Sequence, residues 1–189
     1  DLQSVRDFAK EFLRNYDRLD GLACNAGMVN MASEPQYTKD GFEITMAASY
    51  FGHFLLTELL LENLKKSAPS RMLIVSSVVH QGSESNRPMV HLDDLNYKNR
   101  DYNNFRAYEE AKVAVVLYAK ELAERLKGTG VTTASVHPGW ARSNFGSGGG
   151  FLMRTMMAIM RPFTRGMSDS NEEAAQTSLH VLLSDDAPK

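Results

Sequence analysis

Tyr108 and Lys112 are the two residues whose types and spacing most directly suggest acid–base chemistry. They lie four residues apart in the segment 106–126, whose apolar spacing predicts a helix, so they share one helix face about a turn apart. An ammonium group near a phenol stabilises the phenolate, which lowers the phenol pKa from about 10 toward the working range. Tyr108 is therefore a candidate general acid and base. The alternative is a chance pair on a solvated helix face, which the neighbouring Glu109 and Glu110 would suit.

Polar and turn-forming residues follow three apolar runs that we expect to be buried strands. The runs end at Asn25-Ala26-Gly27, at Ser76-Ser77 and at Pro138-Gly139. Ligands of open parallel sheets bind beyond the carboxyl ends of the strands, so these residues are candidates for a binding site. Each motif alone is also an ordinary turn or helix cap. The helix that carries Tyr108 follows the strand that ends at Ser77, and both side chains can therefore face the same crevice.

The expected elements alternate between helix and strand along the chain. They are helices at 2–16, 40–65, 106–126 and from a Ser170–Glu173 capping box to about 183, and strands at 19–23, 72–75 and 132–136. This alternation favours an α/β fold, with a parallel sheet covered on both faces. The polar stretch 80–104 exceeds ordinary connection lengths, which predicts a functional loop or an insertion. No linker divides the chain, so we expect one domain over residues 1–189.

Composition excludes several classes of function. The 189 residues are 43% hydrophobic and 23% charged, with a net charge of −2, which gives no electrostatic basis for binding nucleic acid. One cysteine, Cys24, cannot form an internal disulfide, and its apolar surroundings predict a structural role. The five histidines are scattered, so we assign no metal site. No run approaches about 18 consecutive apolar residues, and no bilayer-spanning helix is expected.

Taken together and in this order, the motifs resemble the short-chain dehydrogenase/reductases. The set is Asn25-Ala26-Gly27, Ser77, Tyr108-x-x-x-Lys112 and Pro138-Gly139-x-x-x-Ser143. Two further segments, 40–43 and 52–57, are similar to the retinol-dehydrogenase-like branch of that family. The resemblance implies a Rossmann-like, doubly wound parallel sheet. It also implies an oxidoreductase that uses NADP or NAD to interconvert an alcohol and a carbonyl, with a lipophilic substrate as the expectation for this branch.

The resemblance also implies a role for each motif. Tyr108 would pass a proton to or from the substrate oxygen, Lys112 would lower the Tyr108 pKa and bind the nicotinamide ribose, and Ser77 would bind the carbonyl oxygen. The residues expected to contact the cofactor, besides Tyr108 and Lys112, are Asn25, Ala26, Gly27, Pro138, Gly139, Trp140 and Ser143.

Two departures from the family pattern qualify this expectation. Ser49 stands where many members have an asparagine that helps hold a water of the proton relay to the lysine, so we expect a slower or rewired relay. The Gly-rich dinucleotide turn is absent, which predicts that about three strands precede Asp1 in a longer protein and that the last strand follows Lys189. The strand at 19–23 would then be a bare edge. These departures leave an alternative open: a degenerate, non-catalytic relative that acts as an interaction or regulatory protein.

Three further features allow more than one interpretation. The Met-rich segment 151–160 suits a mobile lid over an apolar substrate or a core helix, whereas docking to a membrane is not expected. The apolar faces at 55–64 and 113–119 suit a core or a homodimer interface. Localisation stays open between the cytoplasm and the periphery of an intracellular membrane.

Overall fold

The computed structural model describes residues 1–139 and 170–186. Its helices are α1 (Leu2–Asn15), α2 (Ile44–Met46), the π-helical η1 (Ala47–Phe51), α3 (Gly52–Lys66), the 3₁₀ turn η2 (Val78–Gln81), α4 (Asn104–Arg125) and α6 (Asn171–Leu183). Its strands are β1 (Gly21–Cys24), β2 (Ser70–Val75) and β3 (Val131–Val136). The predicted alternation of helices and strands is confirmed.

The three strands form one parallel sheet in the order β1-β2-β3. Gly21 lies opposite Arg71, and Ser70 lies opposite Val131, so the carboxyl ends of all three strands reach the same edge. The predicted parallel α/β sheet is thereby confirmed. In the part of the chain that the structure describes, β1 pairs with β2 alone, as expected for an edge strand.

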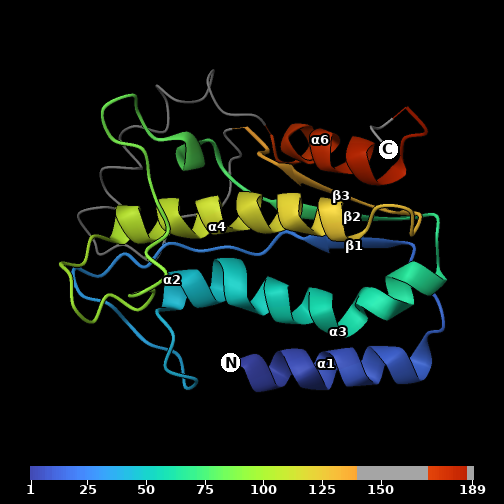
Figure 1. Ribbon diagram of the computed structural model, residues 1–189, viewed down its shortest axis with the longest axis horizontal. Coiled ribbons are helices and arrows are strands. Elements are labelled where there is room, and N and C mark those ends of the chain that lie inside the picture. The colour runs from blue at the N-terminus through green and yellow to red at the C-terminus, as the bar shows by residue number, and fades with distance from the viewer. Residues whose placement is uncertain (140–169, 187–189) are drawn as a thin grey trace.

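Helices cover both faces of the sheet (Figure 1). On one face the core packs α3 and α4 against the strands, and its buried members are Leu22, Cys24, Leu61, Leu64, Met72, Ile74, Val115, Tyr118, Ala119, Leu122, Leu126 and Val131. On the other face α6 contacts β2 and β3, and Arg71 donates from Nη1 to the main-chain oxygens of Val181 and Ser184 at the end of α6. Side chains alternate along a strand, which is why Met72 and Ile74 face α3 and α4 while Arg71 faces α6.

The helix expected at 40–65 begins later and is not regular. Residues 37–43 form a turn in which Thr38 donates from its backbone to Phe42, and Gly41 takes a φ of 82°. This turn prevents a helix from starting at residue 40, and the Glu43 carboxylate instead caps α2 by accepting a hydrogen bond from Met46 N. The π-helical stretch η1 then precedes α3, a local widening that often marks a functional site.

The two apolar faces at 55–64 and 113–119 contribute to the core in part. Leu60, Leu61 and Leu64 of α3 and Val115 of α4 are buried, whereas Leu117 of α4 remains 56% exposed. Among the described residues, the continuous helical stretch Ile44–Lys66 is long and apolar enough by composition to cross a membrane. That stretch packs as a core helix, because α3 lies between α1 and the sheet.

Candidate active site

Ser76 and Ser77 follow β2 and take different positions. Ser76 is buried, and its Oγ donates to the main-chain oxygen of Lys112 at 3.1 Å, which fastens α4 to the end of the strand. Ser77 is half-buried, caps the 3₁₀ turn η2, and is hydrogen-bonded to the side chain of Tyr108. Of the two serines, Ser77 is therefore the one that contacts Tyr108.

Tyr108 lies on the first turns of α4, close to the end of β2. The helix starts where the Asn103 side chain accepts a hydrogen bond from Arg106 N, and Tyr108 is only 7% exposed. Burial raises the pKa of the Tyr108 phenol, and the hydrogen bond with Ser77 lowers it in part. The alternative that Tyr108 and Lys112 lie on a solvated helix face is therefore wrong, because both side chains are buried.

Lys112 is 3% exposed and is held by the strand rather than by the phenol. Its Nζ donates to the main-chain oxygen of Val75 at 2.7 Å and lies 5.6 Å from the centroid of the Tyr108 ring. Burial lowers the pKa of Lys112 to about 8. The expected lowering of the Tyr108 pKa by Lys112 is not seen here, because the contributions to that phenol come from burial and from Ser77.

Gly27 brings the end of β1 against the same ammonium group. A Cβ atom at Gly27 would lie 3.4 Å from Lys112 Nζ and 3.6 Å from Ser49 Oγ. Asn25, Ala26 and Gly27 are themselves exposed, so their backbone forms an open rim beside the buried Lys112. The absence of a side chain at Gly27 leaves room next to the ammonium for a ligand to approach the backbone.

Ser49 lies in η1 and is fully buried, at the position where the family resemblance expects asparagine. Its Oγ accepts from Met28 N and donates to Met28 O, both at 3.3 Å. The hydroxyl therefore fixes the loop that follows Gly27.

His53 is a neighbour of this cluster that the sequence alone did not single out. It follows Ser49 by four residues, the spacing that places two residues on one helix face. Burial, together with the nearby charge of Lys112, lowers the pKa of His53 to about 4. The imidazole is therefore neutral near pH 7. Within residues 1–139 and 170–186, no group of His, Cys, Asp and Glu side chains could hold a metal ion.

Pro138 and Gly139 come one residue after the end of β3, beside the end of β2. Ser76 N donates to the main-chain oxygen of Val136 at 2.7 Å, which aligns the two strand ends, and Gly139 has a φ of 77°. Trp140 and Ser143, and the Met-rich segment 151–160, lie outside the described residues. The strand ends at Gly27, Ser77 and Pro138 thus share one edge of the sheet.

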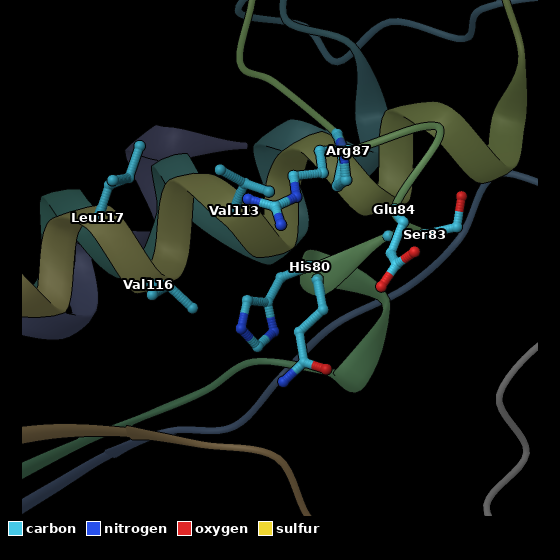
Figure 2. Close-up of a pocket in the computed structure, with 10 residues that line it drawn as sticks. His80, Ser83, Glu84, Arg87, Val113, Val116 and Leu117 are labelled. Carbon is cyan, nitrogen blue, oxygen red and sulfur yellow. The ribbon is translucent and has the colours of Figure 1, made fainter.

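A cavity of about 500 Å³ lies elsewhere, beside α4 (Figure 2). Apolar side chains of α4 line one wall, and residues 80–84 with Arg87 and Pro88 line the rest. None of Ser77, Tyr108 and Lys112 lines it. This cavity is therefore separate from the predicted catalytic residues.

Comparison with known proteins identifies relatives along almost the whole chain. A family model described as short chain dehydrogenase matches residues 1–89. Human retinol dehydrogenase 13 is 39% identical over 187 residues, which cover 98% of this chain and 54% of that protein. Human retinol dehydrogenase 11 is 42% identical over 189 residues, with the same two coverages of 98% and 54%. The chain thus spans about half the length of the curated relatives it matches.

Solved structures share the fold. An uncharacterised protein from Mycobacterium paratuberculosis is 36% identical, with a TM-score of 0.62 over 78% of this chain and 50% of that chain. The RhlG/NADP complex from Pseudomonas aeruginosa is 22% identical, with a TM-score of 0.68 over 96% of this chain and 66% of that chain. The Rossmann-like fold implied by the motifs is confirmed. Because its sequence matches retinol dehydrogenases over 98% of its length on this fold, the chain belongs to the short-chain dehydrogenase/reductase family, in its retinol-dehydrogenase-like branch.

Proposed function

We propose that this chain carries the catalytic and substrate-side part of an NAD(P)-dependent oxidoreductase that interconverts an alcohol and a carbonyl. One observation carries the proposal: Ser77, Tyr108 and Lys112, which come from two elements, meet at the carboxyl end of β2. Buried titratable groups at such a strand end are typical of a reactive centre. No comparison favours the non-catalytic alternative.

The three side chains divide the work of proton transfer. Tyr108 gives its hydroxyl proton to the carbonyl oxygen in reduction, or accepts it from the alcohol in oxidation. Ser77, whose hydroxyl is within hydrogen-bond reach of Tyr108, turns its one proton to the same substrate oxygen and stabilises the charge that develops there. Lys112 donates to Val75 O and places a positive charge 5.6 Å from the centroid of the Tyr108 ring. When bound, the nicotinamide supplies or accepts the hydride.

The residues at the strand ends fit a dinucleotide. A Cβ atom at Gly27 would fill the space beside Lys112 Nζ, whereas glycine leaves it open to a ribose hydroxyl. We propose that Asn25, Ala26 and Gly27 line one side of the cofactor. We propose that four residues that come after β3 in the sequence also contact the cofactor, namely Pro138, Gly139, Trp140 and Ser143. The cofactor is NADP or NAD, and the RhlG complex with NADP supports the first as one option.

The proposed substrate is a lipophilic alcohol or carbonyl compound. Support comes from the relatives, which are named retinol dehydrogenases and are 39–42% identical to this chain. We also propose that the protein forms a homodimer.

The substrate proposal is tested with the full-length protein and a panel of carbonyls and alcohols. The panel contains a retinoid, a steroid, a long-chain aldehyde and a sugar aldehyde, each with the phosphorylated and the unphosphorylated cofactor, and turnover is followed by nicotinamide absorbance. We expect turnover of the lipophilic compounds and none of the sugar. Turnover of the sugar alone would contradict the substrate class, and no turnover with any compound would contradict the proposed function.

A further inference from the structure

Arg100, in the long loop before α4, holds the residue midway between Tyr108 and Lys112. Its Nη1 donates to Glu110 Oε1 at 2.7 Å, and its Nη2 donates to Glu110 Oε2 at 2.7 Å. Glu110 is only 2% exposed. Two parallel, charge-assisted hydrogen bonds to a buried carboxylate fix both the distance and the orientation of the pair.

The loop holds the guanidinium of Arg100 firmly in place. Its Cζ lies 3.7 Å from the centroid of the Tyr97 ring, and its Nε and Nη2 donate to the main-chain oxygen of Asp94 at 3.3 and 3.1 Å. The Asp94 carboxylate in turn accepts from the backbone nitrogens of Lys98 and Asn99 at 2.8 and 2.9 Å. These contacts hold the Arg100 side chain in one conformation, unlike that of a flexible surface arginine.

The other end of this loop is anchored beside η1. The Tyr97 and Tyr102 rings meet edge to face at 5.1 Å, and Tyr102 donates from its hydroxyl to Glu43 Oε1 at 3.0 Å. Glu43 is fully buried and caps α2, which leads directly into η1 and the buried Ser49. The loop thus connects α4 to the segment that packs beside Lys112.

Glu110 lies on the side of α4 opposite to the two predicted catalytic residues. With 3.6 residues per turn, Tyr108 and Lys112 point within about 40° of each other, and Glu110 points about 180° from their midpoint. A clamp on Glu110 therefore restrains the rotation of the turn that presents Tyr108 to Ser77.

We infer that Arg100 is a positioning residue, which sets the rotation of α4 through Glu110 and so the place of Tyr108 and Lys112. The inference rests on the proposed function, because those two groups are what it positions. Small displacements of reacting groups are costly, and an error of about 1 Å can lower a rate about 100-fold. Without its partner, the buried Glu110 carboxylate would draw water or shift, and the turn would move with it.

The test compares two arginines of the same region in the full-length protein. Arg100→Ala removes the clamp, whereas Arg106→Ala removes a pair with Glu109 on the same turn, at 3.2 Å and with a more exposed arginine. We expect Arg100→Ala to lower kcat between about 10-fold and 100-fold with little change in KM. We expect Arg106→Ala to leave kcat at the parental value. Arg100→Lys keeps the positive charge but cannot make two parallel hydrogen bonds to Glu110. Its kcat should therefore lie between those of Arg100→Ala and the parent.

Folding is followed in parallel by the Tm of each variant, so that loss of structure is separated from loss of positioning. A parental kcat in folded Arg100→Ala, or a loss that matches only its unfolded fraction, would overturn the inference. If Arg100→Ala does not fold, Arg100→Lys decides by the same criterion of lowered kcat at parental Tm. A parent protein whose turnover is insensitive to Tyr108→Phe would instead overturn the proposed function itself, which distinguishes the two failures.

Discussion

The Lys112 ammonium donates to the main-chain oxygen of Val75 at 2.7 Å, so a residue of α4 is fixed on the last residue of β2. Val75 is followed by the two serines, and Lys112 is one turn along α4 from Tyr108. This single contact therefore joins the strand that carries Ser77 to the helix that carries Tyr108. It also explains why the lysine is buried: a carbonyl oxygen at a strand end compensates part of its lost hydration.

The depressed pKa of Lys112 predicts a dependence of stability on pH. The pKa is about 8 in the folded protein, against an ordinary value of 10.5. Between these values the unfolded chain keeps a proton that the folded protein has released, so the free energy of unfolding rises with pH. Relative to Lys112→Met, the parent should gain up to about 3 kcal/mol between pH 8 and pH 10.5. Urea denaturation of both proteins without cofactor measures this, and a pH-independent difference would contradict it.

Gly27→Ala should impair the site without unfolding the protein. The added Cβ would lie 3.4 Å from Lys112 Nζ, in the space that we assign to a cofactor hydroxyl. We expect the dissociation constant of the cofactor to rise about 10-fold, which corresponds to about 1.4 kcal/mol. Gly21→Ala, in β1 just upstream, is the matched control, because its Cβ would meet only Leu182 at 3.9 Å. Equal cofactor affinities in the two variants would count against the assigned position.

Ser49→Ala tests whether the serine secures the loop after Gly27. The substitution removes both contacts with the backbone of Met28 at 3.3 Å, inside a fully buried site. The free energy of unfolding should fall by about 1 kcal/mol, the usual net value of an intramolecular hydrogen bond. Chemical denaturation measures the change. A variant as stable as the parent would show that these bonds do not hold the loop.

Tyr102→Phe should destabilise the protein more than Tyr37→Phe. The Tyr102 hydroxyl donates to Glu43 Oε1 and accepts from Asn30 Nδ2, both at 3.0 Å, and Glu43 is fully buried. Leaving a buried acceptor without its donor costs about 1–3 kcal/mol. The exposed Tyr37 donates to the main-chain oxygen of Asn96, so its loss should cost about 0.5 kcal/mol or less. Equal changes in Tm would contradict a structural role for the Tyr102–Glu43 contact.

Periodic contacts were predictable from the sequence, and contacts across the fold were not. The spacing of Tyr108 and Lys112 places them on one helix face, and the apolar runs locate all three strands to within two residues. Glu110, in contrast, suggested a wet surface, because its partner Arg100 comes from an irregular loop ten residues upstream. The hydrophobic periodicity of the sequence does not predict such a pair, because the conformation of the loop depends on tertiary contacts.

Local exceptions to regular structure were also hidden from the sequence. The turn at residues 37–43 delays the helix expected from residue 40, and the π-helical register of η1 has no apolar signature of its own. The hydrogen bond from Lys112 Nζ to Val75 O depends on the position of α4 along β2. The hydrophobic pattern of the sequence does not determine that position. These are the features that decide how Lys112, Gly27 and Ser49 come together.

The comparison of Tyr108→Phe with the parent, in the full-length protein, tests the central claim most directly. The substitution removes one oxygen from a buried ring and leaves the rest of the fold's packing in place. General acid–base catalysis contributes about 100-fold to 10,000-fold, so kcat should fall by at least about 100-fold while the cofactor dissociation constant stays at the parental value. Undiminished turnover by Tyr108→Phe would contradict the account.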